Sequence, residues 1–220
     1  MHESERTVRN TEFEQLQGEF VGHLFRLNAV RFEGPVPFKL HDVYRDATKI
    51  SAYVDNRVVL GDADARSAAI LLYKYLAQNL RFQHVAGIPT GAVPHGAFLA
   101  EECSVGLVDL QQELLTGHNE VLLLVEDTVS LATSAIPHID ALRQNNHVVN
   151  DIVALYTWEI GGREVLKEHG VHLHVAITPE VLLSYALQHD YIRPEMCMEI
   201  IAQRNRLAGY LHRAELRRLS

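Results

Sequence analysis

Residues 121–130 read Val121-Leu122-Leu123-Leu124-Val125-Glu126-Asp127-Thr128-Val129-Ser130. Five consecutive apolar residues without alternation predict a strand buried on both faces, as in the middle of a parallel sheet. Two acids and several hydroxyl side chains follow directly. Carboxylates accept hydrogen bonds from vicinal hydroxyls, and a helix N-terminus holds phosphate. This pattern predicts a sugar-phosphate site after a central strand, although an ordinary helix entry without a ligand fits it equally well.

The next helix is expected to begin close to this turn. Pro137 is tolerated only in the first turn of a helix, where its missing N–H has no intrahelical partner. Thr133 or Ser134 is therefore the predicted N-cap, because a hydroxyl side chain at that position satisfies a free backbone N–H.

The rest of the chain alternates between strand and helix patterns, which predicts an α/β fold with a mostly parallel sheet covered on both faces. Two helices are expected first, at Glu12–Asn28 and Asp62–Leu80, with a short strand at Ser51–Asp55 between them. Further strands are predicted at His84–Ile88, Val105–Asp109, Val121–Glu126, Val149–Trp158 and Val171–Ile177. Further helices are predicted at Pro94–Glu102, Ser134–Asn145, Gly162–His169, Pro179–His189 and Pro194–Leu216.

Ligands of such sheets bind beyond the carboxyl ends of the strands. Two predicted strand ends carry suitable residues: the acidic turn described above, and Gly87-Ile88-Pro89-Thr90-Gly91.

Bulk composition limits the class of protein. The chain has 220 residues, of which 47% are hydrophobic, enough for the core of one domain. No secretory leader is expected at the charged N-terminus, and the apolar runs are too short to cross a bilayer. The two cysteines form no CxxC pattern, which favours a reducing, cytoplasmic setting. A net charge of −8 argues against nucleic acid as the main partner.

Several segments resemble the orotate phosphoribosyltransferases, a branch of the type I phosphoribosyltransferases. Residues 125–134 resemble the motif that binds phosphoribosyl pyrophosphate (PRPP), residues 85–96 the pyrophosphate loop and its helix, and residues 49–57 an N-terminal signature. The resemblance extends over residues 12–196. It implies one domain with a core at about 62–177, a small hood at about 12–57 completed by C-terminal segments, and a homodimer.

The resemblance also assigns roles to residues. Ribose and phosphate would be bound by Glu126, Asp127, Thr128, Ser130, Thr133 and Ser134. The pyrophosphate loop would contain Pro89, Thr90 and Gly91. The pocket for the base would be bordered by Lys39, Lys49, Tyr53 and Arg57. Mg²⁺ is implied only together with PRPP, and no direct metal site is expected.

Two departures from the family pattern bear on activity. The segment Asp109–Glu120 replaces a mobile loop rich in Lys and Arg, yet it contains neither residue, and His118 is its only potential cation. The PRPP turn has Leu131 and Ala132 where glycines are typical, so it either keeps a left-handed backbone at a cost of about 1–2 kcal/mol or is reshaped.

The distribution of charge along the chain also argues against efficient binding of a polyphosphate. Residues 82–142 hold eight acids and no Lys or Arg, and the other 20 acids balance the 20 basic residues. Like charge near a polyphosphate lowers its affinity. We therefore favour a homologue with lost or weakened transferase activity that binds a nucleoside monophosphate or PRPP, in a regulatory role or beside an active homologue. An active transferase that obtains cations elsewhere, and a scaffold protein, are the alternatives.

Two other features have plain structural interpretations. His172 and His174 would share one face of a strand, but no third ligand is placed by spacing, so a metal site is not favoured. Tyr156 and Trp158 end an apolar run and are predicted to pack in the core.

Overall fold

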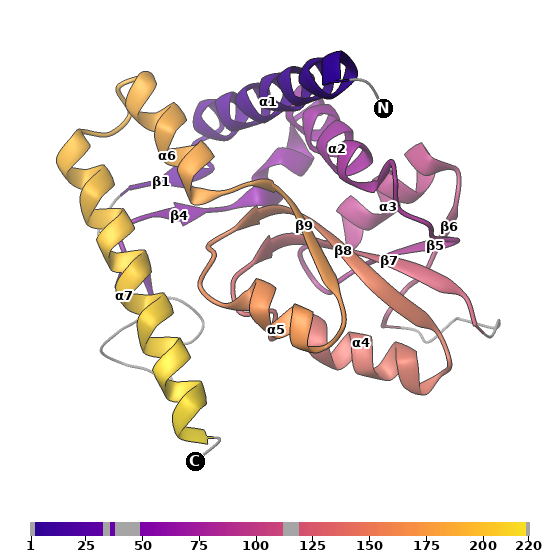
Figure 1. Cartoon of the computed structure of the whole chain (residues 1–220). Coiled ribbons are helices and arrows are strands. Elements are labelled where there is room, and N and C mark those ends of the chain that lie inside the picture. The colour runs from indigo at the N-terminus through magenta and orange to yellow at the C-terminus, as the bar shows by residue number, and fades with distance from the viewer. Residues whose placement is uncertain (1–2, 33–35, 38–48, 112–118, 219–220) are drawn as a thin grey trace.

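The computed structural model describes residues 3–32, 36–37, 49–111 and 119–218. Its centre is a five-stranded parallel sheet in the order β6-β5-β7-β8-β9 (Figure 1). The strands are β5 (His84–Gly87), β6 (Gly106–Leu107), β7 (Val121–Val129), β8 (Val148–Thr157) and β9 (His172–Ile177). The predicted parallel sheet and the central place of Val121–Val125 are both confirmed.

The apolar run of β7 contributes to both faces of the sheet. Leu123 and Val125 belong to one hydrophobic cluster, and Leu122 and Leu124 belong to a second cluster on the other face. All four side chains are at most 1% exposed. Burial on both sides explains why the sequence of this strand shows no alternation.

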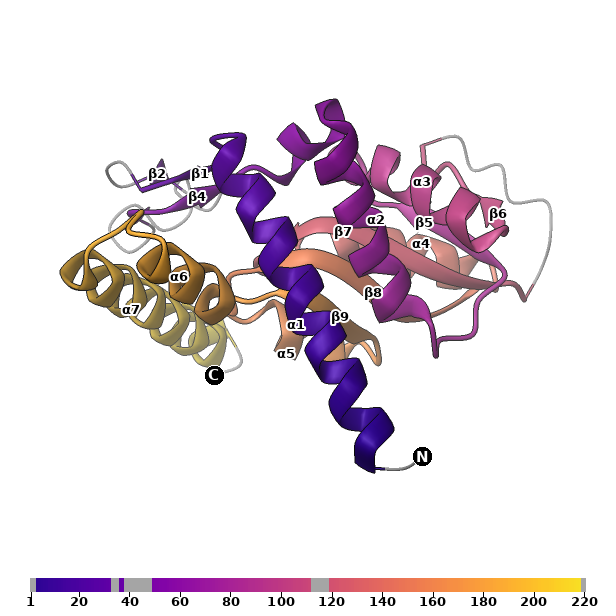
Figure 2. The same ribbon diagram turned by 90° about the horizontal axis from the view of Figure 1, so that it is seen from above.

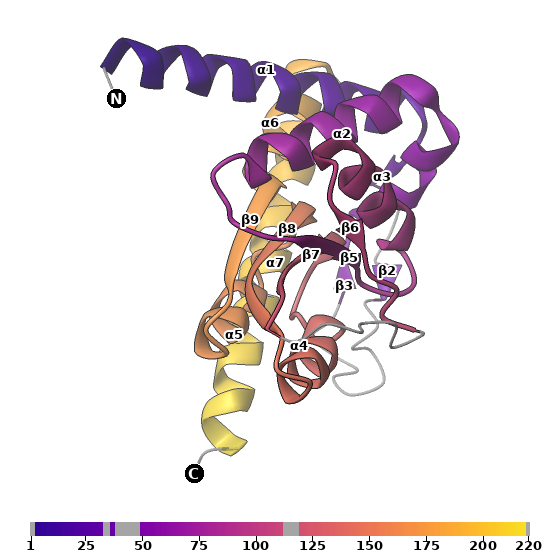
Figure 3. The same cartoon turned by 90° about the vertical axis from the view of Figure 1, so that its right-hand side faces the viewer.

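Helices cover the two faces of the sheet. On one face lie α1 (Glu3–Arg26), α2 (Ala63–Ala77) and α3 (Val93–Cys103), and on the opposite face lie α4 (Ala135–Gln144) and α5 (Gly162–Glu168) (Figure 3). The side chains of the first face form the larger cluster, because α1 and α6 (Pro179–Gln188) add a further layer of apolar residues to it.

Short N-terminal strands and the C-terminal helices gather on the side of the molecule opposite to α3 and β6 (Figure 2). The strand β1 (Val30–Arg31) pairs with β4 (Tyr53–Val54), and β2 (Val36–Pro37) pairs with β3 (Lys49–Ile50), both antiparallel. The 3₁₀ helix η2 (Asn56–Gly61) follows β4, and α7 (Pro194–Arg218) ends the fold. Gln203 of α7 accepts a 2.6 Å hydrogen bond from the backbone N–H of Ser51, which attaches α7 to the N-terminal strands.

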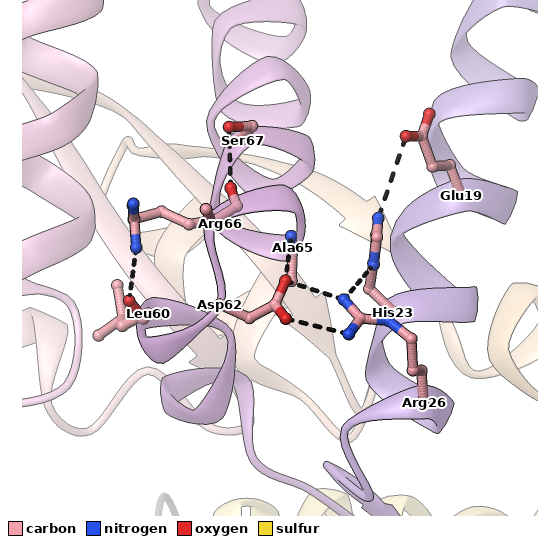
Figure 4. A network of polar contacts seen from close by, with 9 residues as sticks. Glu19, His23, Arg26, Leu60, Asp62, Ala65, Arg66 and Ser67 are labelled. Atoms are coloured by element: carbon pink, nitrogen blue, oxygen red, sulfur yellow. Dashed lines mark hydrogen bonds and ion pairs between the residues drawn. The ribbon is translucent and has the colours of Figure 1, made fainter.

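An ion pair joins the end of α1 to the start of α2 (Figure 4). Arg26 donates to both carboxylate oxygens of Asp62, at 3.0 and 2.8 Å, and Asp62 also accepts from the backbone N–H of Ala65 as the N-cap of α2. Because η2 ends immediately before Asp62, this contact also holds the segment that leads from β4 into the core.

Three predicted boundaries were wrong. The helix α1 begins at Glu3 rather than Glu12, since its first turns are polar and show no apolar period. The strand β6 is reduced to Gly106–Leu107 at the edge of the sheet. The strand β7 continues to Val129, because residues 126–129 pair with β8 beyond the end of β5. In the described part of the chain, none of the helices combines the length and hydrophobicity needed to span a membrane.

Candidate active site at the ends of β5 and β7

The strand order places a topological switch between β5 and β7. The chain leaves β5 toward β6 on one side, and from β7 it proceeds to β8 on the other, so the connections diverge at this point. Ligands of open α/β sheets bind in the crevice that such divergence leaves. A cavity of about 680 Å³ lies here, lined by Ala52, Tyr53, Val54, Asp55, Arg57, Pro89, Thr90, Gly91, Glu126, Asp127, Thr128, Ser130, Leu131, Ala132, Thr133, Ser134 and Trp158.

This cavity brings together most of the residues proposed from the sequence. Every predicted residue of the acidic turn and of the first loop lines it, together with Tyr53 and Arg57. Lys39 lies outside the described residues. Lys49 is the first residue of β3. In the segment Asp109–Glu120, residues 112–118 also lie outside the described part of the chain.

The acidic pair is buried at the carboxyl end of β7. Glu126 is 6% exposed, and its Oε1 accepts a 2.6 Å hydrogen bond from the hydroxyl of Ser134. Oδ1 of Asp127 accepts from the backbone N–H of Thr128 at 2.8 Å. Burial raises the pKa of Glu126 to about 8, with a further contribution from the charge of Asp127, and burial also raises the pKa of Asp127. A ligand that offers hydroxyl donors or a cation would therefore stabilise the charged forms.

The predicted N-cap position of Ser134 is confirmed, but the capping hydrogen bond expected from its side chain is absent. Ser134 occupies the N-cap position with helical backbone angles, but its side chain makes no hydrogen bond to the helix, because the hydroxyl is directed to Glu126 instead. The first N–H groups of α4 thus receive no side-chain cap from this residue. The backbone N–H groups of Ala135 and Ile136 donate instead to the carbonyl of Ala132, at 3.0 and 3.1 Å, and Pro137 has no N–H to donate.

The turn after β7 keeps a left-handed backbone without glycine. Ala132 has a φ of +57°. Of the two alternatives that the sequence allowed, a left-handed backbone and a reshaped turn, the structure therefore has the first. A left-handed conformation costs a residue with a Cβ about 1–2 kcal/mol. The start of α5 packs closely beneath this turn: the N–H of Gly162 donates to the Ser130 carbonyl at 3.0 Å, and a Cβ on Gly162 would lie 2.5 Å from that oxygen.

The first loop reaches the acidic pair directly. A Cβ on Gly91 would lie 2.9 Å from Oδ2 of Asp127, so the loop can approach this carboxylate only where no side chain intervenes. The loop is positioned by close packing of α3 on β5, where a Cβ on Gly96 would lie 2.6 Å from the backbone nitrogen of Gly87. The glycines seen in the sequence therefore serve close approach between backbone segments.

Arg57 is the one cation among the described residues that line the cavity. Its Nε and Nη2 donate to the two carboxylate oxygens of Asp55, each at 2.8 Å, and Nη2 also donates to the Tyr53 hydroxyl at 3.5 Å. The Arg57 guanidinium lowers the pKa of Asp55. Sequence reasoning did not single out Asp55 as a site residue, although its spacing of two from Arg57 was visible.

Asn56 connects η2 to the end of β7 and was missed entirely. It is 1% exposed, and its Nδ2 donates to the carbonyl of Asp127 and to the hydroxyl of Thr128, both at 2.9 Å. A polar residue between Asp55 and Arg57 resembles an ordinary surface residue in the sequence. Only the approach of two distant segments shows that it is buried.

Trp158 packs in the core, as predicted, and it also lines the cavity. Its ring meets that of Tyr156 edge-on, with centroids 5.1 Å apart, and 4% of the residue is exposed.

His174 pairs with Asp151, with 2.7 Å between Nε2 of the histidine and Oδ1 of the acid. Among the described residues no group of three or more His, Cys, Asp or Glu is placed to hold a metal ion.

Comparison with known proteins defines the class first. The fold is that of a type I phosphoribosyltransferase: UMP synthase from Leishmania donovani matches 86% of this chain with a TM-score of 0.76 and 20% identity, and the match spans 42% of that longer chain. Orotate phosphoribosyltransferase from Aeropyrum pernix matches 75% of this chain and 97% of its own length, with a TM-score of 0.67 and 26% identity.

The sequence comparison then indicates the branch. Orotate phosphoribosyltransferase from Coxiella burnetii is 25% identical over 173 residues, which cover 71% of this chain and 83% of that protein. No protein-family model matches the sequence. The chain is a divergent relative of the orotate phosphoribosyltransferases, and the resemblance read from its motifs is confirmed.

Proposed function

We propose that this protein binds the ribose 5-phosphate part of a nucleoside monophosphate or of PRPP in the cavity between β5 and β7, and transfers the phosphoribosyl group slowly or not at all. The observation that carries the proposal is the convergence of the acidic pair, the turn at residues 128–134 and the first loop on one cavity. In the cell it would act as a regulatory subunit, as a homodimer or together with an active homologue.

The binding chemistry follows from the parts of the cavity. Glu126 and Asp127 can accept hydrogen bonds from the two vicinal hydroxyls of a ribose. The hydroxyl side chains of Thr128, Ser130 and Thr133 line the same cavity and can donate hydrogen bonds to the 5′-phosphate. The approach of Gly91 to Asp127 supports a ligand that touches both loops at once.

Weak transfer is inferred from the charge inventory of the same cavity. The reaction releases pyrophosphate, and preorganised positive charge must stabilise the charge that develops. The described lining offers three carboxylates, on Asp55, Glu126 and Asp127, against the single cation of Arg57, which is already paired.

A magnesium ion fits this site only together with a ligand. Mg²⁺ is bound in proteins through one or two carboxylates plus substrate phosphates and retained waters. The ion would enter with PRPP, held by the oxygens of the ligand and by waters beside Glu126 and Asp127, and would neutralise part of the pyrophosphate charge. This agrees with a donor set of two adjacent buried carboxylates at the wall of the cavity.

An active phosphoribosyltransferase is the second candidate. It is favoured by the first loop and the acidic turn, which both line one cavity. It is also favoured by the similarity to proteins that are named orotate phosphoribosyltransferases. In that case the missing cations come from Lys39, Lys49, the C-terminal arginines or a second subunit. A pure scaffold is less well supported, because it would not require a buried acidic pair in the cavity wall.

Two measurements on the purified protein test the proposal. Calorimetric titration with uridine and orotidine monophosphates and with PRPP–Mg²⁺ should show binding of at least one of them. An absorbance assay of orotate with PRPP–Mg²⁺ should stay near background. Turnover on the order of 1 s⁻¹, as in ordinary enzymes, would support the second candidate instead.

Matched variants locate the binding site. Asp127→Asn should weaken binding at least tenfold, since it replaces a charged acceptor of the ribose hydroxyls with a weaker neutral one. Asp151→Asn is the control, because Asp151 pairs with His174 on β9 away from the cavity, and it should bind ligand like the unmodified protein. Equal binding by all three proteins would reject the site.

A further inference from the structure

Two segments that lie far apart in the chain form the part of the cavity wall that the base of a nucleotide would face. The first comprises residues 52–55 and Arg57, around β4, and the second is Trp158, directly after β8. The acidic turn and the first loop are assigned to the ribose and its phosphates in the proposed function, so these two segments remain for the base. We call them the base-side wall.

Neither segment is held in place by the central sheet alone. The strand β4 has two residues and pairs with β1 in a separate two-stranded sheet, and such a pair is at most marginally stable in isolation. Beyond Trp158 the chain has left β8, and Glu159 has a φ of +50°, a conformation that residues with a Cβ rarely adopt. The geometry of the base-side wall therefore depends on contacts with other elements.

Gln203 of α7 is attached to the residue directly before the first segment. Its Oε1 accepts a hydrogen bond from the backbone N–H of Ser51 at 2.6 Å, and its Nε2 donates to the Ser51 hydroxyl at 3.0 Å. Ile200 and Leu207, on either side of Gln203 in α7, are at most 1% exposed, so this part of the helix is fixed in the core. Figure 1 shows α7 running beside the N-terminal strands.

Arg204, the next residue of α7, approaches the second segment. Its Nη1 is 3.8 Å from Oε2 of Glu159, the residue directly after Trp158, and the same nitrogen pairs with Glu180 of α6. The Arg204 side chain is 16% exposed, and charges that are largely buried are screened less by salt than exposed ones. Consecutive residues of one helix thus hold both segments of the base-side wall.

We propose that Gln203 and Arg204 are positioning residues that set the geometry of the base-side wall, so that docking of α7 and binding of a nucleotide stabilise each other. The inference rests on the proposed function, because it presumes that a nucleotide binds in the cavity. Both residues lie beyond residues 12–196, over which the sequence resembles the phosphoribosyltransferases, so the resemblance assigns them no role. Coupling between two sites is reciprocal, so a helix that favours the bound wall is itself stabilised by the ligand.

Uridine monophosphate and ribose 5-phosphate are the two probes, because they differ by the base. In calorimetric titrations, Gln203→Ala and Arg204→Ala should each lower the affinity for uridine monophosphate about threefold or more, the loss expected for a hydrogen bond or a partly exposed ion pair. The affinity for ribose 5-phosphate should stay unchanged, since this probe lies against the acidic turn. A general weakening of the fold would lower both affinities together.

Matched controls remove the same groups elsewhere. Arg193→Ala removes a positive charge at an exposed position directly before α7. Gln188→Ala removes an amide whose Nε2 bonds Ser184 of the same helix, α6. Both should keep the ratio of the two affinities. Arg204→Lys keeps the charge and should restore part of the ratio that Arg204→Ala loses.

Two further readouts follow the wall and the helix directly. Trp158 is the only tryptophan of the chain and is 4% exposed, so its emission should move to longer wavelength in Arg204→Ala as water reaches the ring, but not in Arg193→Ala. In the unmodified protein, saturating uridine monophosphate should slow amide hydrogen exchange at residues 200–207, and ribose 5-phosphate should slow it less.

The outcomes separate this inference from the proposed function. An unchanged ratio of the two affinities in both folded variants, or exchange at residues 200–207 that uridine monophosphate leaves unchanged, would overturn the inference and leave the proposed function intact. If a variant does not fold, hydrogen exchange in the unmodified protein decides by itself. Absence of binding by both probes and by PRPP–Mg²⁺ would reject the proposed function, and the inference with it.

Discussion

The hydroxyl of Ser134 lies 2.6 Å from Oε1 of Glu126 and donates a hydrogen bond to it. The contact joins the residue before α4 to the carboxylate at the end of β7, eight positions earlier in the chain. A hydroxyl that caps a helix stabilises the helix, whereas this one stabilises the charged form of a buried acid. Its removal should therefore alter the chemistry of the site more than the stability of α4.

Ser134→Ala should raise the pKa of Glu126 further. The Ser134 hydrogen bond lowers the pKa of Glu126 against the larger effect of burial, so its loss leaves the effects of burial and of the Asp127 charge less strongly opposed. The measurement is NMR titration of the side-chain carboxyl of Glu126, whose midpoint should move to higher pH. Ser67→Ala on α2, whose hydroxyl bonds only to its own helix, should leave the midpoint in place. A shift to lower pH would contradict the assignment.

Glu126 should make the ligand-free protein less stable as pH rises. Its pKa lies at about 8 in the folded state against an ordinary value of 4.5, so the folded state binds more protons between these values. The free energy of unfolding therefore falls from about pH 4.5 to pH 8, and the contribution is fully present below that window. Urea denaturation at pH 5 and pH 8 measures the slope.

Glu126→Gln should remove most of that slope, since the amide stays neutral. Relative to the unmodified protein, the stability of the variant should rise by about 3 kcal/mol between pH 5 and pH 8. Glu101→Gln, at an exposed position of α3, is the control and should keep the original slope. Parallel slopes for Glu126→Gln and the unmodified protein would show that Glu126 is not the responsible group.

Ala132→Gly should change stability little while improving phosphate binding. Relief of the left-handed strain gains about 1–2 kcal/mol, while the lost buried methyl group costs about 0.8 kcal/mol and the added chain freedom about 0.5–1 kcal/mol. The net change in unfolding free energy should lie within about 1 kcal/mol. Affinity for ribose 5-phosphate should rise, because one Cβ leaves the cavity wall.

Ala141→Gly is the comparison for that variant. Ala141 is exposed within α4, where glycine should cost about 1 kcal/mol without any gain in binding. If both variants lose the same stability and neither binds phosphate more tightly, the strain at Ala132 has no functional consequence.

Asn56→Ala should weaken both the fold and the site. The substitution removes two hydrogen bonds and leaves the Asp127 carbonyl and Thr128 hydroxyl without this donor, at a cost of about 1–3 kcal/mol. Nucleotide affinity should fall as well, because η2 no longer holds the end of β7. Asn145→Ala, at an exposed position after α4, should change neither quantity by more than about 0.5 kcal/mol. Full nucleotide affinity in Asn56→Ala would show that Asn56 only stabilises the fold.

Local patterns were sufficient for the architecture. The apolar run of β7 predicted a central strand, because a strand buried on both faces admits no polar residue. The strand order then places the ends of β5 and β7 side by side, and the two segments proposed from sequence meet there. Start and end points were less accurate: the polar first turns of α1 have no apolar period, and the last residues of β7 depend on their partner strand β8.

Contacts between distant segments depend on the tertiary structure and could not be predicted from the sequence. The sequence shows that Glu126, Ser134 and Ala132 exist near a helix start, but not that the hydroxyl turns to the acid or that alanine adopts a positive φ. Likewise Asn56 becomes a buried bridge only because η2 packs against the end of β7, 71 residues away in the chain. The physical reason is that periodicity reports the environment of a whole element, whereas the partner of a single polar side chain depends on which segments the fold brings together.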